Sequence, residues 1–405
     1  MGRVLAGKRI VVGVTGSIAA FKVAGWVSRL AKEEARVAVI MTESARQFVS
    51  PLTFSALSGE KTYCSMFDGD LSSAMTHIEL AQEAALFIIA PASAQTIARL
   101  AYGMADDLLS ATVLATRAPV VVCPAMNSKM FLHAATQDNI GRLRELGYIV
   151  VDPDSGMMAC KDDGPCRLVE YESIQEVVLK CLSVGDFKDE KILITAGPTQ
   201  EAMDPARFIS NRSSGKMGYA LARSAYRRGA EVTLVSGPTA LECPYGVKRI
   251  EIVSAQEMYD AVMAESGEAS VIIKSAAVSD FKPAVCHSHK VKKEKVESAI
   301  ELQQNPDILF ELGQRKERDS QVIVGFAAES DNIEEEARKK LHRKNLDLIA
   351  VNDITEDNAG FGVDTNRITL LDAQTVTHLP LTSKSDTADL ILDSVSNILQ
   401  HRKSR

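Results

Sequence analysis

The stretch Lys191–Ala220, KILITAGPTQEAMDPARFISNRSSGKMGYA, decides how the chain is divided. It opens with a short apolar run, turns at Gly197-Pro198, and passes through a polar loop that ends at Lys216 into an apolar, helix-forming segment. This order predicts a strand, a long loop and a helix N-terminus. A loop rich in Gly and Ser that ends at the positive end of a helix dipole suits a phosphate or a carboxylate. A nucleotide-type domain therefore begins in the middle of the chain.

The length and composition predict two soluble domains. The chain has 405 residues, which is too long for a single hydrophobic core of ordinary size. Of these residues 46% are hydrophobic and 24% are charged, and no apolar run is long enough to span a membrane. The N-terminus runs directly into a strand-like segment, without the pattern of a signal peptide. Seven scattered cysteines without a C-x-x-C pair indicate reduced thiols. We expect a cytoplasmic protein without a membrane partner.

The charge distribution argues against a nucleic-acid partner. The net charge is -7, and the one dense basic patch in the sequence is Lys290 to Lys295. A general nucleic-acid surface carries basic residues over a whole face, so this balance leaves room for a local anion site only.

Residues 9–41 predict a β-α-β unit, with strand RIVVGV, helix TGSIAAFKVAGWVSRLAK and strand VAVIM. The turn Thr15-Gly16-Ser17 joins the carboxyl end of a strand to a helix N-terminus, the usual position of a phosphate. The dinucleotide fingerprint G-x-G-x-x-G is absent, because Ala19 takes its last position, so a mononucleotide is the better prediction. A tight turn without a ligand fits this loop alone equally well.

Strand-like runs at residues 86–90, 120–123 and 148–151 extend this predicted sheet. The first two lead into the loops 91–95 and 124–127, and ligands of open parallel sheets bind outside the carboxyl ends of the strands. His77 is a candidate base, although a lone His is more often structural. Residues 153–167 form a Gly-, Pro- and Asp-rich loop with Cys160 and Cys166, either a flap over a site or a connector with buried thiols.

The second half predicts another α/β domain. The boundary is expected near Asp189, which divides the chain into residues 1–189 and 190–405. Strand-like runs at 232–237, 271–277, 322–329 and 346–353 alternate with helical segments, and a hairpin and a last helix follow. The predicted fold class is α/β, with two Rossmann-like or flavodoxin-like parallel sheets.

Charged residues mark the predicted chemistry of this half. The basic run 287–295 has the composition of a solvated loop, but a triphosphate also needs several cations. Lys340 and Lys344, spaced i and i+4 on a predicted helix, could complete such a clamp. Asp280 follows a strand and could hold a nucleotide hydroxyl or Mg²⁺.

Several motifs, in this order, resemble two enzyme families. The first half resembles the flavin-dependent cysteine decarboxylases in T-G-S-I-A-A-F-K, T-H-I-E-L, A-P-A-S-A-Q-T-I-A-R, G-M-A-D-D-L-L, P-A-M-N-S-K-M and A-C-K-D-D-G-P-C-R. The second half resembles phosphopantothenate-cysteine ligase in A-G-P-T-Q-E, D-P-A-R-F-I-S-N-R-S-S-G-K-M-G, S-A-A-V-S-D-F and G-F-A-A-E. Together they cover nearly the whole chain and are similar to the bifunctional family of coenzyme A biosynthesis in which phosphopantothenoylcysteine decarboxylase is fused to this ligase.

The resemblance implies an FMN-dependent decarboxylation in the first half. In that family FMN accepts a hydride from the cysteine moiety, a thioaldehyde-like intermediate loses carbon dioxide, and the reduced flavin returns the hydride. By similarity His77 is the base, Asn127 holds the carboxylate and amide of the substrate, and Cys160 protonates the enethiol. The flavin contacts implied in the same way are Gly16, Ser17, Thr42, Ser93 and Asp106. The chain departs from the family at Cys166, where Gly is usual, and at Phe131, where Trp or Tyr is usual.

For the second half the resemblance implies ligation of L-cysteine to 4'-phosphopantothenate with CTP and Mg²⁺. The substrate is activated as an acyl-cytidylate, pyrophosphate leaves, and the amine of cysteine attacks. Asn211 is implied near the activated carboxylate and Lys290 as a catalytic cation, with Lys292 as the alternative register. The nucleotide contacts implied are Ala276, Asp280, Lys290, Asn305, Asp307, Phe326, Lys340 and Lys344, of which Asp280 is also the candidate metal ligand. A homo-oligomer is expected by analogy with the family.

Two other functions stay open. The flavin half could be a non-catalytic binding or regulatory domain joined to an active ligase, as in some relatives of this fold, although His77, Asn127 and Cys160 occur together. A nucleotide-linked dehydrogenase on two Rossmann-like halves is the third possibility, and the missing fingerprint argues against it. Bound flavin rather than bound NAD would separate these alternatives.

Overall fold

The computed structural model describes residues 2–67, 75–155, 164–292, 299–315, 321–329, 333–353 and 362–404. The chain divides into two compact units, Met1–Ser183 and Val184–Arg405. Phe187 lies before the expected boundary at residue 189 and is buried in the core of the second unit. Arg228 of this unit bonds the carboxylate of Asp186. The connection therefore belongs to the second unit.

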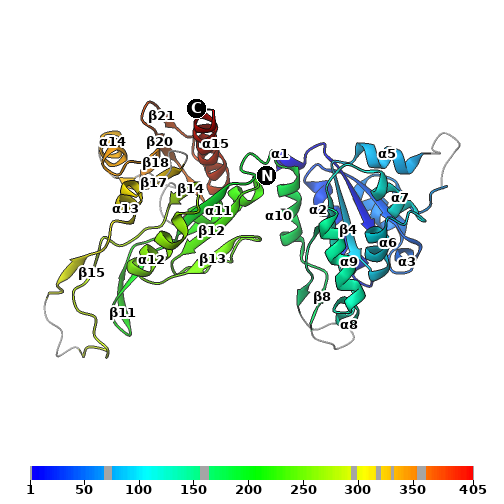
Figure 1. The fold of residues 1–405 in the computed structure, drawn as a ribbon, viewed down its shortest axis with the longest axis horizontal. Coiled ribbons are helices and arrows are strands. Elements are labelled where there is room, and N and C mark those ends of the chain that lie inside the picture. Colours follow the sequence, from blue (N-terminus) through cyan, green and yellow to red (C-terminus); the bar gives the residue numbers. More distant parts are fainter. Residues whose placement is uncertain are drawn as a thin grey trace. The chain divides into compact units, whose positions relative to one another are not determined.

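The first unit is built on a parallel six-stranded sheet of order β3-β2-β1-β4-β5-β6. Figure 1 shows this unit, with β4 labelled among the helices around it. Its strands are β1 (Arg9–Val14), β2 (Arg36–Met41), β3 (Thr62–Tyr63), β4 (Leu86–Ala92), β5 (Val120–Pro124) and β6 (Ile149–Val150). The strand order reverses between β1 and β4, and such a switch point is where ligands of doubly wound folds bind. A short antiparallel pair, β7 (Asp154–Ser155) and β8 (Pro165–Arg167), follows β6.

Helices cover this sheet, and its strands are almost continuously apolar because both faces are buried. The helices are α1 (Gly2–Leu5), α2 (Ala20–Lys32), α3 (Glu43–Arg46), α4 (Pro51–Ser58), α5 (Thr76–Glu83), α6 (Ala94–Tyr102), α7 (Leu108–Ala115), α8 (Ser128–Phe131), α9 (Ala134–Glu145) and α10 (Tyr171–Leu182). One core cluster joins side chains of α5, α6, α7 and α9 to one face of the strands.

The second unit repeats this order in an eight-stranded sheet, β13-β12-β9-β14-β17-β18-β20-β21. Its strands are β9 (Lys191–Ala196), β12 (Glu231–Ser236), β13 (Lys248–Glu251), β14 (Val271–Lys274), β17 (Val322–Glu329), β18 (Leu348–Asp353), β20 (Ile368–Leu371) and β21 (Val376–His378). The first six strands are parallel and the last two form the predicted antiparallel hairpin. The switch point lies between β9 and β14.

Three antiparallel pairs lie outside this sheet, and helices cover both of its faces. The pairs are β10 (Gln200–Asp204) with β11 (Arg207–Ser210), β15 (Phe281–Pro283) with β16 (Leu302–Gln304), and β19 (Thr365–Asn366) with β22 (Thr382–Ser383). One core cluster contains α11 (Lys216–Arg227) and α15 (Lys384–Lys403). The other contains α12 (Ala255–Ser266), α13 (Ile308–Gln314) and α14 (Ile333–Arg343). The predicted fold, two α/β units with parallel sheets, is confirmed.

None of the helices seen in the described ranges has both the length and the apolar character of a membrane span.

Candidate active sites at the two switch points

Thr15 joins the loops that meet at the switch point of the first unit. Its buried hydroxyl donates to the carbonyl of Pro91 at 2.6 Å and accepts from the backbone N–H of Ser93 at 2.9 Å. The N–H of Thr42 donates to the carbonyl of Val14 at 3.0 Å. The loops after β1, β2 and β4 are therefore held together at the carboxyl edge of the sheet.

Gly16 lets two of these loops approach closely. A Cβ atom built on Gly16 would lie 2.5 Å from the Cβ of Ser44, closer than real side chains come. Thr42 and Ser93 are the N-caps of α3 and α6, and Ser17 is half-buried in the turn between Thr15 and α2. The predicted flavin residues of these loops thus meet in a narrow cradle at the switch point, which is where ligands of doubly wound folds bind.

A second part of the predicted flavin site is a hollow of about 340 Å³. It is lined by Met41, Thr42, Glu43, Cys64, Ser65, Met66, Phe67, Asp106, Asp107, Leu108 and Leu109. Arg99 fixes the polar side of this hollow, since its guanidinium lies 3.0 Å from Asp106 and 2.8 Å from Asp107. Thr42 and Asp106, which are far apart in sequence, therefore line one space with apolar and polar walls, as a flavin ring requires.

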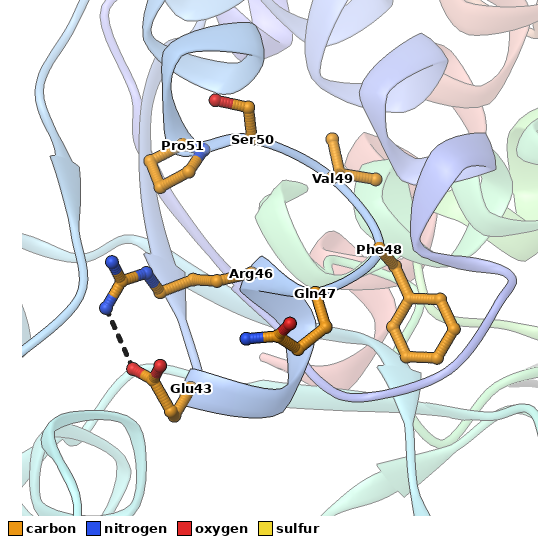
Figure 2. Close-up of a pocket in the computed structure, with 7 residues that line it drawn as sticks. All are labelled: Glu43, Arg46, Gln47, Phe48, Val49, Ser50 and Pro51. Carbon is orange, nitrogen blue, oxygen red and sulfur yellow. Dashed lines mark hydrogen bonds and ion pairs between the residues drawn. The ribbon is translucent and has the colours of Figure 1, made fainter.

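The segment after Thr42 borders another hollow of about 320 Å³, lined by residues 43 and 46–51 (Figure 2). Figure 2 shows the guanidinium of Arg46 turned toward the carboxylate of Glu43, and the two groups are 2.8 Å apart. The guanidinium of Arg46 is already paired with Glu43, and none of the predicted site residues lines this hollow. We therefore assign no ligand to the hollow.

The predicted base and substrate residues start from the same edge of the sheet. His77 lies in the first turn of α5, the helix that precedes β4, so it begins at the carboxyl edge. Its ring is half-buried, and its Nδ1 atom has no hydrogen-bond partner among the described residues. Asn127 follows β5 and caps α8, accepting from the N–H of Lys129 at 2.9 Å.

Cys160, the third predicted catalytic residue of this unit, lies outside the described residues. The strands that flank its segment are β7 and β8, which pair with each other. Gly164, just before β8, is so close to α8 that an added Cβ would lie 3.2 Å from the Cβ of Ser128. Gly164, the first described residue after Cys160, therefore lies beside the helix capped by Asn127.

In the second unit, Asn211 connects the loop before α11 to the end of β14. Its side-chain amide donates to the carbonyls of Val278 at 3.0 Å and Ala277 at 3.3 Å. Ala276 is buried, and its N–H donates to the hydroxyl of Thr195 at 3.1 Å. Gly215, with φ of 75°, is the N-cap of α11. The predicted anion loop thus lies at the switch point between β9 and β14.

Four predicted nucleotide residues form one group at the start of α13. Asn305 donates its backbone N–H to the carbonyl of Asp280 at 2.8 Å, and its side chain to the carbonyl of Ser279 at 2.9 Å. Asp307 caps α13 and pairs with the ammonium of Lys344, which lies 2.8 and 2.7 Å from its two oxygens. Burial alone would raise the pKa of Asp307, but these hydrogen bonds outweigh it and lower the pKa.

Two further predicted nucleotide residues are Lys340, in α14, and Phe326, in β17. Helix α14 ends at Arg343, and the N–H of Lys344 still donates to the carbonyl of Lys340 at 3.0 Å, one helical turn earlier. An added Cβ on Gly313 would lie 1.9 Å from the carbonyl oxygen of Lys344, so the lysine side chain runs along α13 to Asp307. Phe326 packs against the core cluster of α11 and α15, on the other face of the sheet from Ala276.

Lys290 is exposed, and its neighbour Val291 is held by two residues of the β10–β11 hairpin. The N–H of Val291 donates to Asp204 at 3.3 Å, and Arg207 donates to the carbonyl of Val291 at 3.1 Å. Asp204 also pairs with Arg207 at 2.5 Å, and these hydrogen bonds lower the pKa of Asp204. Neither residue is predicted from the motifs, although the acid–base spacing in D-P-A-R is the signal that could reveal them.

Lys274 is a further residue that the motifs do not reveal. It ends β14, in register with Thr195 of β9 and Gly325 of β17. Loss of hydration and the nearby Lys344 lower its pKa to about 8, and Asp307 and Asp280 oppose this change. The sequence signal is a lysine at the end of an otherwise apolar strand, VIIK.

The candidate metal ligand Asp280 is exposed. Over the part of the chain that the structure covers, His, Cys, Asp and Glu side chains nowhere gather in threes as a metal site would need.

Comparison with known proteins covers both units. The Flavoprotein family model matches residues 2–183, and the model of the DNA/pantothenate metabolism flavoprotein C-terminal domain matches residues 187–399. The coenzyme A biosynthesis bifunctional protein CoaBC of Vibrio vulnificus is 45% identical over 98% of this chain and 99% of its own length. That of Escherichia coli K12 is 46% identical over 96% and 97%. The crystal structure of a CoaBC C-terminal domain covers 54% of this chain and 99% of that one, at 42% identity and a TM-score of 0.46.

Proposed function

Because the chain belongs to the CoaBC family of coenzyme A biosynthesis bifunctional proteins, we propose that it joins L-cysteine to 4'-phosphopantothenate with CTP and then decarboxylates the product with FMN to 4'-phosphopantetheine. Membership of the family makes the chain a bifunctional decarboxylase and ligase of coenzyme A biosynthesis. The nucleotide, the flavin type, Mg²⁺ and the residue roles are the content of the proposal. The observation that supports it is that each unit has a parallel sheet with a switch point, where ligands of this fold class bind.

We assign ligation to the second unit, residues 184–405. Asn211, held by two carbonyls of the loop after β14, lies beside the N-terminus of α11, where an activated carboxylate is stabilised by backbone N–H groups. Lys290 supplies a mobile positive charge for the phosphates as pyrophosphate leaves. The exposed carboxylate of Asp280 is the protein ligand for a Mg²⁺ ion that the phosphates bring. Formation of an acyl-cytidylate then lets the amine of cysteine attack.

We assign decarboxylation to the first unit, residues 1–183. The cradle at Gly16, Ser17 and Ser93 takes the phosphate of FMN, and the hollow at Thr42 and Asp106 takes its ring. Bound FMN supplies reversible hydride transfer, which makes loss of carbon dioxide possible without net oxidation.

The protein groups of this site move protons and orient the substrate. The imidazole of His77, whose Nδ1 atom has no hydrogen-bond partner among the described residues, accepts a proton from the cysteine moiety. Asn127 orients the substrate carboxylate through its amide. Cys160 donates the proton to the enethiol.

Mass spectrometry of the product tests the whole proposal. The purified protein is incubated with 4'-phosphopantothenate, cysteine, CTP and Mg²⁺, and we expect 4'-phosphopantetheine and bound FMN. Accumulation of phosphopantothenoylcysteine would instead support the alternative, an active ligase joined to a regulatory flavin domain. Light scattering of the same sample tests the homo-oligomer that the family analogy predicts.

A further inference from the structure

Arg99 lies on the helix that connects the two parts of the proposed flavin site. Helix α6 begins after its cap Ser93, in the cradle of the first switch point, and Arg99 lies in its last turn. An α-helix rises about 1.5 Å per residue, so the two positions are about 9 Å apart along the axis of α6. One rigid element therefore fixes the position of Arg99 relative to the cradle.

The guanidinium of Arg99 bridges two carboxylates in the wall of the hollow of about 340 Å³. Its Nη2 atom lies 3.0 Å from Asp106 and its Nη1 atom lies 2.8 Å from Asp107. Both aspartates line the hollow. The planar fork of an arginine can hold two acceptors in fixed directions, which the single ammonium of a lysine cannot do.

The two carboxylates differ in what they have left to bind. Asp107 caps α7, where its Oδ1 atom accepts from the N–H and from the hydroxyl of Ser110, both at 2.7 Å. Its Oδ2 atom accepts from Arg99, so both oxygens are used. In the described part of the chain Asp106 bonds Arg99 alone, through its Oδ2 atom, and its side chain is 50% exposed. The Oδ1 atom of Asp106 can therefore accept a hydrogen bond from a molecule in the hollow.

The charges of the hollow favour a neutral hydrogen-bond donor over a phosphate. Glu43, Asp106 and Asp107 line it, whereas the cations beside them are Arg46, which pairs with Glu43, and Arg99. Two guanidinium groups thus face three carboxylates, and the remaining negative charge repels a phosphate. The hydroxyl groups of the ribityl chain and the ring N–H of a flavin are neutral donors that suit a carboxylate.

We propose that Arg99 is a positioning residue for the flavin, because it turns Asp106 toward the hollow to accept a hydrogen bond from the ribityl chain or the ring. The inference rests on the proposed function and adds to it a residue that acts through Asp106. Without the guanidinium the adjacent charges of Asp106 and Asp107 repel each other. Asp107 is still held by Ser110, so the half-exposed Asp106 is the side chain that turns away into water.

The test measures flavin binding to Arg99→Gln. The full-length protein, freed of flavin, is titrated with FMN and with riboflavin, and the quenching of flavin fluorescence is followed. We expect the variant to weaken both flavins by the same factor, about tenfold, the effect of losing one hydrogen bond to a charged group. Riboflavin lacks only the phosphate, which lies at the cradle. Arg99→Lys keeps the charge without the fork, and its affinity should lie between those of the wild type and of Arg99→Gln.

A double-mutant cycle separates positioning from a general structural role. Asp106→Ala removes the acceptor itself, so in that background Arg99→Gln should weaken neither flavin further. Arg144→Gln is the matched control, since it removes an arginine that pairs with Asp152 at 2.7 Å on the surface. This control should bind both flavins as the wild type does. Thermal unfolding of the flavin-free proteins shows that each variant is folded.

Three results would overturn the inference. One is an unchanged affinity for both flavins in a folded Arg99→Gln protein. Another is a loss of affinity for FMN but not for riboflavin, which would place the guanidinium on the phosphate. The third is a further loss in the Asp106→Ala background, which would make the role of Arg99 purely structural. A wild-type protein that binds neither flavin would refute the proposed function instead, so the two failures are distinguishable.

Discussion

At the scale of single residues, His77 and Lys290 separate the two proposed reactions. We predict that His77→Asn lowers release of carbon dioxide by roughly 100-fold or more, because a general base contributes a factor of that size, while ligation is unchanged. Lys290→Gln should suppress ligation and leave decarboxylation of supplied phosphopantothenoylcysteine intact. Carbon dioxide release and pyrophosphate release are measured separately on each variant. Loss of both activities from either replacement would refute the two-site model.

Lys274 also predicts a dependence of stability on pH. Its pKa of about 8 in the folded protein lies below the usual lysine value near 10.5, so the unfolded chain binds the proton more tightly. Its charge therefore destabilises the fold fully below about pH 8, and this effect disappears as the pH rises toward 10.5.

Thermal unfolding across this pH range checks that expectation. Without nucleotide, Lys274→Met should melt at a higher temperature than the wild type at pH 7, and the difference should shrink between pH 8 and 10. The charged groups around the ammonium, Lys344, Asp307 and Asp280, are unchanged in both proteins. A variant that melts lower than the wild type at pH 7 would show that Lys274 stabilises the fold.

At the scale of elements, the β10–β11 hairpin positions the segment of Lys290. We predict that Asp204→Asn lowers ligation about tenfold through a rise in KM for the nucleotide, since it weakens the bonds to Arg207 and Val291. Decarboxylation should not change. Asp260→Asn, on α12, alters an exposed carboxylate that bonds Gln256 and serves as the control. Steady-state kinetics with CTP would contradict the role if both variants matched the wild type.

The loops of the first switch point depend in the same way on Thr15. We predict that Thr15→Val weakens FMN binding at least several-fold, because it removes the two hydrogen bonds that join the loops after β1 and β4. Thr15→Ser keeps the hydroxyl and should retain the flavin. The ratio of flavin to protein absorbance after dialysis measures this, and equal retention by the valine variant would rule out the role.

At the scale of the whole molecule, each unit has its own core and its own switch point. We predict that residues 1–183 and 184–405, expressed separately, each fold and each retain one reaction, flavin binding with decarboxylation in the first and ligation in the second. Circular dichroism and the two activity assays check this. An insoluble or inactive fragment would show that the units need each other.

Much of the fold follows from local sequence. Apolar runs such as RIVVGV and KILITA, each followed by a Gly-containing turn and an amphipathic segment, determine parallel strands with crossover helices. The same runs place Gly16, Asn127 and Asn211 just after strands or before helices, and so at the carboxyl edges of the sheets. These features are predictable because they depend on neighbours within one turn or strand.

The contacts that complete the sites were decided only by the tertiary structure. The pairing of Asp307 with Lys344 and the hold of Asp204 on Val291 join residues 37 and 87 positions apart. Lys274 reads in the sequence as the end of a strand, and only folding brings its ammonium under the charges of Lys344, Asp307 and Asp280. Hydrogen bonds and desolvation act through space, so no local pattern in the chain reports them.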